Sequence, residues 1–546
     1  MTAQRRDLLI LAFLGALLFL PALGRRDVWN PDEARYAEVA REMQAGGTWA
    51  VPQLNGQVYS EKPPLMFWSI IAAGALLNGI NNGINGGGID ETAARLPSAL
   101  AAIGALLLVY RIGERLFGRR AAWLAAAAFG TCFKVLWQGR FGQIDMLLTA
   151  LVTLAVWFWV RGYTEDRPGF YPLFFLSAGF ATLAKGPVGL LPPLLSILVF
   201  LAWTKNLREA KRMHIGLGLL LWAAVMLLWL VPAGLSAGPD YLRKIVFKQN
   251  VTRYADPWHH IQPWYYYLTI IPAEFFPWSV LLPTGIAVGW RRLEGRQRQG
   301  FLFALCWIVV TLVFFSISPA KRSVYVLTLY PALALVVGAA LDRLAAEWPR
   351  DRAWLVRPLA LLSGLAVLLV VALPLAGRNR PEAAPLGGET FVWWVTAALL
   401  PLALGALYAW WVSRSDELGR VGRAAGGVAA GMGLVMLTAA FVLLPRFDTV
   451  KSARGLSRVL LAQAAPDEPY AIYPRLDSTF LFYTHRNTID LADDEAKLHE
   501  LVARPGRLWL LIQRDEIRKL KQPLPPLREV ARDQDPREGY LLLTRP

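Results

Sequence analysis

Long apolar runs recur throughout residues 1–445, separated by short polar loops rich in arginine and lysine. A helix needs about 20 apolar residues to cross a bilayer, whereas a run of about 10 to 14 more often lies at its surface or inside the protein. The hydrophobic fraction of 55% and the mean hydropathy of +0.37 exclude an ordinary soluble domain. The sequence therefore predicts a polytopic α-helical membrane protein.

The length rule and the cytoplasmic excess of arginine and lysine together predict thirteen spans. Their ranges are 7–24, 95–113, 121–137, 146–161, 170–184, 187–203, 215–235, 266–288, 300–317, 324–341, 357–376, 390–412 and 424–444. The first run resembles a signal peptide in outline, but the orientation of the later spans requires it to remain as an uncleaved span. Starting from the cytoplasm, this arrangement places the C-terminus outside.

The formal net charge of +17 is spread over the short loops and does not form one basic stripe. This distribution is typical of membrane topology and suits anionic membrane lipids, and it argues against a nucleic-acid partner. Cys132 and Cys306 both lie inside apolar runs. The sequence therefore contains no disulfide framework and no cysteine metal site.

Residues 25–64 form a polar stretch that carries two charged pairs. Asp32 and Glu33 begin a short amphipathic segment, and Glu61 and Lys62 precede two prolines. A carboxylate and a lysine brought together beside a bilayer suggest chemistry on a charged substrate. The first outer loop is predicted to extend to residue 92.

A structural alternative stands beside this functional one. Asn30, Pro31 and Glu33 match the start of a helix, with a capping side chain, a first-position proline and an acid near the positive helix end. The following apolar run, 65–80, is short and precedes a turn rich in asparagine and glycine. If it crossed the membrane, the arginines after the next span would fall outside, so we expect a helix at the outer interface.

The remaining predicted outer loops add further polar groups. They are the short loop after the third span, the tight turn at Lys185, the long aromatic loop 236–265, and the turn that contains Lys321 and Arg322. Two adjacent cations outside the membrane break the positive-inside rule, and such exceptions are expected at functional sites.

The outer face therefore gathers cations, carboxylates and tyrosines: Asp32, Glu33, Glu61, Lys62, Asp145, Lys185, Arg253, His259, His260, Lys321 and Tyr325. Lysine, arginine and tyrosine can bind the phosphate of a lipid, and a carboxylate can orient or deprotonate an acceptor.

Purely structural roles remain open for several of these residues. Lys185 and Lys321 are also compatible with side chains that only reach up to the head groups. Asp145 is compatible with a structural partner of Arg140, and the two histidines with interfacial packing.

The composition changes at about residue 446. Apolar strand-like runs at 507–512 and 539–544 alternate with helical segments such as 492–503. We expect a small extracytoplasmic α/β domain over 446–546, following a transmembrane domain over 1–445.

A set of motifs along the membrane part resembles the membrane-embedded GT-C glycosyltransferases that use polyprenyl-phosphate sugar donors. The motifs are PDEARYAEVAREM, YSEKPPLMFW, ETAARLPSAL, GQIDM, LAKGPVG, QNVTRY with PWYYYL, and SPAKRSVYVLTLYP. Within the wider protein-mannosyltransferase superfamily, the branch most similar is that of the lipid A aminoarabinose transferases.

The resemblance implies a GT-C fold with interfacial helices in the first outer loop and a C-terminal periplasmic domain. It implies catalytic roles for the acids Asp32 and Asp145. It also implies a set of phosphate-binding or site-lining residues, namely Lys62, Arg253, Lys321, Tyr325 and Tyr59, with support from Glu33, Glu61 and Lys185.

One departure concerns metal binding. Some lipid A aminoarabinose transferases carry a histidine just before the arginine of QNVTRY, which joins the motif glutamate in a metal site. Here these positions read Lys248, Gln249 and Asn250. Only Glu61, His259 and His260 remain as weak candidates for metal ligands. No cofactor is therefore predicted with certainty.

The resemblance implies inverting transfer of a sugar from an undecaprenyl-phosphate carrier to an envelope acceptor. The reaction would occur at the periplasmic face of the bacterial inner membrane. The expected sugar and acceptor are 4-amino-4-deoxy-L-arabinose and lipid A. Two alternatives stay open: a related transferase acting on a protein or another envelope glycan, and a sugar-lipid transporter. A transporter would place charges near mid-membrane, whereas the charges here gather at one face.

Overall fold

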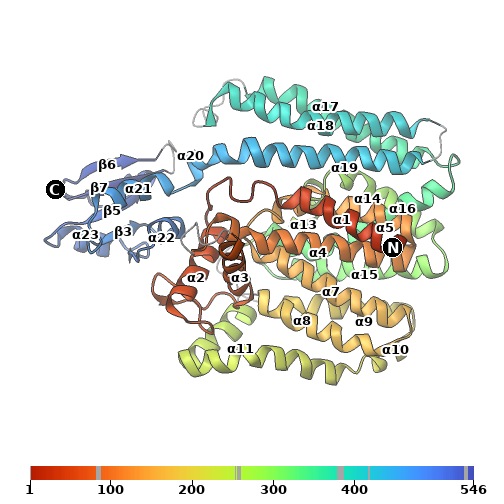
Figure 1. Cartoon of the computed structure of the whole chain (residues 1–546), viewed down its shortest axis with the longest axis horizontal. Helices are drawn as coiled ribbons and strands as arrows, with labels where there is room; N and C mark the ends of the chain where they lie inside the picture. The colour runs from red at the N-terminus through yellow and green to blue at the C-terminus, as the bar shows by residue number, and fades with distance from the viewer. Residues whose placement is uncertain are drawn as a thin grey trace.

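The protein consists of a long helical bundle with an α/β unit at one end (Figure 1). The computed structural model describes residues 2–80, 88–252, 254, 260–377, 386–415, 419–533 and 539–545. The N-terminus lies on the bundle, and the C-terminus lies in the α/β unit.

Each of the thirteen predicted spans is mostly helical within the described ranges. The bundle helices are α1 (Ala3–Phe19), α4 (Glu91–Phe117), α5 (Arg119–Gly130), α6 (Phe133–Gln138), α7 (Ile144–Thr164), α8 (Tyr171–Lys185), α9 (Leu191–Trp203), α10 (Arg208–Arg212), α11 (Ile215–Arg243), α13 (Tyr266–Glu274), α14 (Leu282–Arg292), α15 (Gly295–Ile317), α16 (Tyr330–Ala346), α17 (Ala353–Gly377), α18 (Glu389–Ser413) and α19 (Arg420–Thr438). The short helix η5 (Ser323–Leu329) precedes α16.

Eight helices of the described part are long and apolar enough to cross a membrane, or up to nine if a bent pair counts as one span. That pair, α13 with the helix that follows it, bends by 110°. Other predicted spans are shorter or broken, as where α5 ends before α6. The protein is thus a multi-pass membrane protein, and the number of thirteen spans stays a prediction.

The bundle core depends on small residues that let helices approach closely. At Gly338 of α16, an added Cβ would lie 2.6 Å from the carbonyl oxygen of Ala121, so only glycine fits against α5. Alanines of α4, including Ala102 and Ala105, are fully buried in the same core. Close helix packing through small residues is a common device of membrane proteins.

The predicted loop 236–265 is partly helical. Helix α11 contains a kink at Gly238, whose φ of 78° is not helical, and a second helix runs on from there to Arg243. A further helical segment follows over Lys244–Thr252. The kink lies three residues after the predicted end of the span at 235, because glycine can adopt the backbone conformation that breaks the helix.

The first outer loop forms a compact layer at the end of the bundle. It contains α2 (Asp32–Gly46), the hairpin strands β1 (Gln53–Leu54) and β2 (Gln57–Val58), and α3 (Leu65–Ile80). The predicted helix over 65–80 is confirmed as a helix, and its place at the membrane interface stays a prediction. The capping role considered for Asn30 is wrong: Pro31 precedes α2, which has no side-chain cap. Asn30 instead lines a cavity together with Asp477 of the C-terminal unit.

The C-terminal unit is a five-stranded sheet with the order β4-β3-β5-β7-β6. Its strands and helices are α20 (Asp448–Lys451), α21 (Arg454–Gln463), β3 (Tyr470–Tyr473), α22 (Ser478–Thr484), β4 (Ile489–Asp490), α23 (Glu495–Ala503), β5 (Trp509–Gln513), α24 (Arg514–Ile517), β6 (Arg528–Arg532) and β7 (Tyr540–Thr544). Strands β4 and β5 pair parallel to β3, and β7 pairs antiparallel to both β5 and β6. The predicted strands and helix are confirmed, and the domain boundary at 446 stays a prediction.

The C-terminal unit binds the segment before α2 through an ion pair and hydrogen bonds. Arg454 forms an ion pair with Asp27 at 2.6 Å, and the Trp29 indole donates to Asp448 at 2.8 Å. The backbone N–H of Val28 donates to a tyrosine hydroxyl of α22 at 2.9 Å. The position of the chain segment before Asp32 is therefore fixed partly by residues more than 400 positions away.

Candidate active site

Asp32, at the first residue of α2, is paired with Arg322. The Arg322 guanidinium lies 2.7 Å from a carboxylate oxygen of Asp32, and the Gln143 amide donates to the same oxygen at 3.4 Å. Burial alone would raise the pKa of Asp32, but Arg322, Arg35 and Lys62 lower it below its usual value. Asp32 is therefore an ionised, buried carboxylate near neutral pH.

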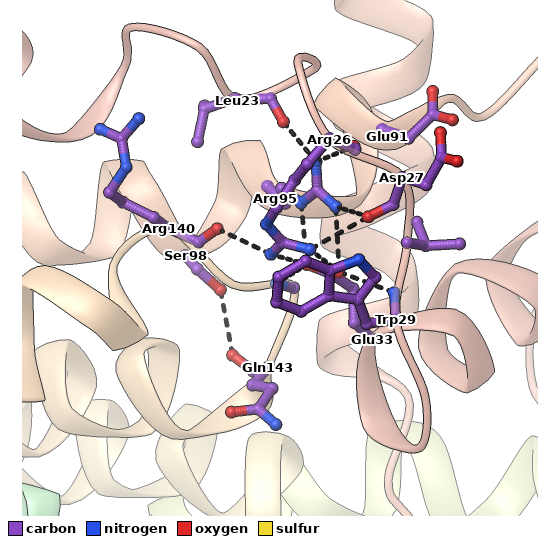
Figure 2. Close-up of polar contacts among 12 residues, drawn as sticks. Leu23, Arg26, Asp27, Trp29, Glu33, Glu91, Arg95, Ser98, Arg140 and Gln143 are labelled. Atoms are coloured by element: carbon purple, nitrogen blue, oxygen red, sulfur yellow. Dashed lines mark hydrogen bonds and ion pairs between the residues drawn. The ribbon is translucent and has the colours of Figure 1, made fainter. Parts of the chain in front are cut away.

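The next residue, Glu33, has a structural role (Figure 2). The carboxylate of Glu33, 2% exposed, accepts bidentate hydrogen bonds from Arg26 at 2.7 and 3.0 Å and from Arg95 at 2.8 and 3.0 Å. It also accepts the backbone N–H groups of Trp29 and Gly142. Every face of the carboxylate is occupied, so Glu33 joins three segments and sets the position of α2.

Asp145, at the start of α7, forms a buried ion pair with Lys185 at the end of α8. The Lys185 ammonium also lies 4.5 Å from the ring centre of Tyr325. The alternative partner, Arg140, instead donates to the backbone carbonyls of Leu18, at 2.6 Å, and Pro21. The pairing of Asp145 with Arg140 is therefore wrong, and so is the view of Lys185 as a side chain that merely reaches head groups.

The two lysines Lys62 and Lys185 line one cavity of about 360 Å³, here named the lysine cavity. Its lining also includes Tyr325 and apolar side chains such as Leu191 and Phe314. A cavity lined by two cations and by apolar side chains fits an amphipathic molecule with an anionic head and a hydrocarbon tail.

Arg322 interacts with the carboxylates of both Asp32 and Asp145. It binds Asp32 directly, and the charge of Asp145, the partner of Lys185, helps to raise the pKa of Arg322. From the sequence, Arg322 was predicted only as one of two adjacent outer cations, beside Lys321. The available signal was the adjacent pair of outer cations, without information on which of the two faces the site.

Lys321 is bound to the backbone next to the lysine cavity and is not among the described residues that line it. Its ammonium donates to the carbonyls of Gln262 at 3.0 Å and Ser318 at 2.6 Å, and the side chain is buried. These bonds hold the turn before η5. The phosphate-binding role of Lys321 stays a prediction, although the cation from this turn that reaches Asp32 is Arg322.

Tyr59 and Glu61 form a small network beside the lysine cavity. The buried Tyr59 hydroxyl donates to Glu61 at 3.5 Å, and Arg35 pairs with Glu61 at 3.4 Å. Within the described ranges, no group of three histidine, cysteine, aspartate or glutamate side chains is placed to hold a metal ion. His260 is exposed, and its carbonyl accepts the backbone N–H of Lys321. Arg253 and His259 lie outside the described residues.

Asp32 itself lines a second cavity of about 410 Å³, here named the aspartate cavity. Its walls are aromatic, with Trp137 stacked on Phe141 at 4.5 Å between ring centres and Trp29 edge-on to Phe141 at 5.8 Å. Phe447, from beyond α19, completes this wall. The candidate site thus comprises two cavities, and Lys62 of the lysine cavity is near enough to Asp32 of the aspartate cavity to lower its pKa.

The fold matches that of solved membrane enzymes. The crystal structure of ArnT from Cupriavidus metallidurans bound to undecaprenyl phosphate aligns with a TM-score of 0.82 at 24% identity, covering 100% of this chain and 98% of that one. An oligosaccharyltransferase from Archaeoglobus fulgidus aligns with a TM-score of 0.52 at 13% identity, over 90% of this chain and 65% of that one. This likeness shows that the chain has a GT-C fold.

Sequence relatives narrow this class. Residues 61–231 match the family described as dolichyl-phosphate-mannose-protein mannosyltransferase. The undecaprenyl phosphate-α-4-amino-4-deoxy-L-arabinose arabinosyl transferase of Erwinia tasmaniensis is 30% identical over 73% of each chain. The first such transferase of Pseudomonas fluorescens is 33% identical over 62% of this chain and 60% of its own length. The chain belongs to this family of arabinosyl transferases, and the resemblance found in its motifs is confirmed.

Proposed function

We propose that this protein transfers 4-amino-4-deoxy-L-arabinose from an undecaprenyl-phosphate carrier to lipid A, at the periplasmic face of the bacterial inner membrane. The observation that carries the proposal is the nearness of the two cavities at Asp32: this carboxylate lines the aspartate cavity, is paired with Arg322, and has its pKa lowered by Lys62 of the lysine cavity. A transferase must hold a donor and an acceptor together with the reacting atoms between them.

The lysine cavity is the proposed donor site. Lys62 and Lys185 would bind the carrier phosphate, with Tyr325 beside them. The apolar wall, including Leu191 and Phe314, would receive the first part of the polyprenyl chain. Asp145 serves here as a positioning residue, because its carboxylate holds the Lys185 ammonium in the cavity.

The aspartate cavity is the proposed acceptor site. A phosphate oxygen of the acceptor would attack the anomeric carbon of the sugar, and the bond from that carbon to the carrier phosphate would break with inversion. The electron pair of that bond leaves with the polyprenyl phosphate, whose new charge Lys62 and Lys185 would stabilise. No proton transfer is needed, because an acceptor phosphate is already ionised near neutral pH.

The state of Asp32 agrees with a phosphate acceptor. A general base works best with a pKa near the working pH, whereas the pKa of Asp32 is lowered. Asp32 is then an electrostatic and orienting group: it holds Arg322 where the acceptor phosphate and the sugar would meet. An acceptor hydroxyl would have required a stronger base.

The test is mass spectrometry of lipid A from a host that makes the donor but lacks its own transferase. Wild-type protein should add aminoarabinose, and Asp32→Asn should abolish the addition. Asp467→Asn, at an exposed carboxylate of the C-terminal unit, is the matched control and should be fully active. An unmodified lipid A with wild-type protein present in the membrane would refute the acceptor. It would favour the alternative of transfer to a protein or another envelope glycan.

A further inference from the structure

A third cavity, of about 180 Å³, lies where the C-terminal unit meets the segment before α2. Polar side chains dominate its lining: Asn30, Lys451, Ser452, Asp477, Gln513 and Tyr540. Most of these residues come from the C-terminal unit, and none is used in the mechanism above. We name it the polar cavity.

The polar cavity adjoins the aspartate cavity. Asn30 and Lys451 line both of them, so the two spaces share one wall. Asn30 precedes Asp32 by two residues and lines the polar cavity together with Asp477. A molecule whose reacting group lies at Asp32 therefore has the polar cavity next to it.

The chemistry of the polar cavity fits hydroxyl groups better than hydrocarbon. The Gln513 amide donates to the Tyr540 hydroxyl at 3.3 Å, and Asp477 accepts the backbone N–H of Thr479 at 2.9 Å. Amide, hydroxyl and carboxylate groups retain further donor and acceptor capacity beyond these bonds. Such a mixed set suits the ring hydroxyls and amides of a sugar.

Lys451 supplies the one feature that a plain sugar site would not need. It ends α20 with an exposed side chain, at the border of the two cavities. Within the described ranges no ion pair includes it, whereas Arg454, three residues on, is paired with Asp27 and Glu91. An ammonium group at this border is suited to an anionic group on the same molecule.

We propose that the C-terminal unit forms part of the acceptor site: Lys451 binds an anionic group of a phosphorylated glycolipid head group, and the polar cavity binds its sugar hydroxyls. This inference rests on the proposed function, because it takes the molecule in the aspartate cavity to be the acceptor. It assigns acceptor recognition to the C-terminal unit and the donor to the membrane bundle.

The test measures acceptor binding and transfer separately. Full-length protein in nanodiscs is titrated with lipid A, with phosphatidylglycerol as the reference anionic lipid. Lys451→Gln should bind lipid A about tenfold more weakly, the effect of losing one hydrogen bond to a charged group. Lys451→Arg should restore most of the binding. Tyr540→Phe, which removes one hydroxyl from the polar cavity, should weaken binding by about three- to fivefold.

Lys521→Gln is the matched control, since it removes an exposed lysine of the same unit that lines neither cavity. It should bind like wild type. In transfer assays, Lys451→Gln should raise the KM for the acceptor and leave the KM for the donor unchanged. Unchanged lipid A binding in Lys451→Gln, or an equal loss in Lys521→Gln, would overturn the proposal, and so would equal binding of phosphatidylglycerol.

Failure of the proposed function gives a different result. If wild-type protein binds lipid A through Lys451 but transfers no aminoarabinose to it, the acceptor site stands and the donor sugar is wrong. If wild-type protein transfers the sugar while Lys451→Gln keeps its acceptor KM, the function stands and the proposed acceptor contact is wrong.

Discussion

The guanidinium of Arg322 lies 2.7 Å from the carboxylate of Asp32, although 290 residues separate them in the sequence. One comes from the first turn of α2, and the other from the turn before η5. Each neutralises the other in a largely buried place. Arg322 also lies near enough to Asp145 for the charge of that carboxylate to help raise its pKa.

Replacing Arg322 by glutamine should lower kcat by about 100- to 1000-fold, the typical effect of removing a group that stabilises developing charge. The donor KM should change little, because Lys62 and Lys185 remain. Steady-state kinetics on the purified protein would check this. Arg458→Gln, at an exposed arginine of α21, should behave as wild type. Full activity of Arg322→Gln would contradict the assigned role.

The pH dependence of transfer follows from the lowered pKa of Asp32. Burial opposes this lowering, but Arg322, Arg35 and Lys62 prevail. The carboxylate therefore stays ionised through the neutral range, and activity that depends on it is lost only as pH falls through the lowered pKa. The acidic limb of the rate profile should move to higher pH in Arg322→Lys, whose contact with Asp32 is less well oriented. An acidic limb near neutral pH in wild type would argue against an ionised Asp32.

Glu33→Gln should make the protein easier to unfold, although it removes no group that takes part directly in the reaction. The substitution leaves Arg26 and Arg95 buried without their carboxylate, and breaking such a pair costs about 3 to 5 kcal/mol. Thermal unfolding in detergent should show a clear fall in Tm. Asp32→Asn should lower Tm less, because Arg322 is partly exposed and remains hydrated. Equal Tm values for wild type and Glu33→Gln would contradict this role.

Lys185→Ala should raise the donor KM, and Asp145→Asn should do so to a smaller extent. Lys185 is placed in the lysine cavity, whereas Asp145 acts by holding it. Loss of one charge-assisted hydrogen bond costs about 1.5 to 3 kcal/mol. The measurement is the donor KM at saturating acceptor. If Lys185→Arg leaves the donor KM as high as Lys185→Ala does, a charge role for this position is excluded.

The sequence predicted the parts of the site that come from single motifs. Asp32, Lys62, Asp145 and Lys185 were identified because charged residues in outer loops stand out from the apolar runs on either side of them. Helix and strand positions followed from apolar periodicity, as at 65–80 and 507–512. These features depend on local composition, which is visible in the sequence itself.

The choice between neighbours needed the tertiary structure. Lys321 and Arg322 are adjacent in sequence, yet Lys321 binds backbone carbonyls while Arg322 reaches Asp32. Asp32 and Glu33 likewise differ in their partners, since the Glu33 carboxylate is paired with two buried arginines, Arg26 and Arg95. Successive side chains of a turn or helix point in different directions, and only packing decides which one faces the site.

The sequence by itself determined the class of this protein: its membrane bundle, the outer charged loops and the motifs of a glycosyltransferase family. Tertiary structure alone decided the pairs Asp32–Arg322 and Asp145–Lys185, and the place of Lys451 between two cavities. Apolar length and charge placement are local properties, set by the energy of burying each segment. Partners that lie hundreds of residues apart meet only after the whole chain has packed.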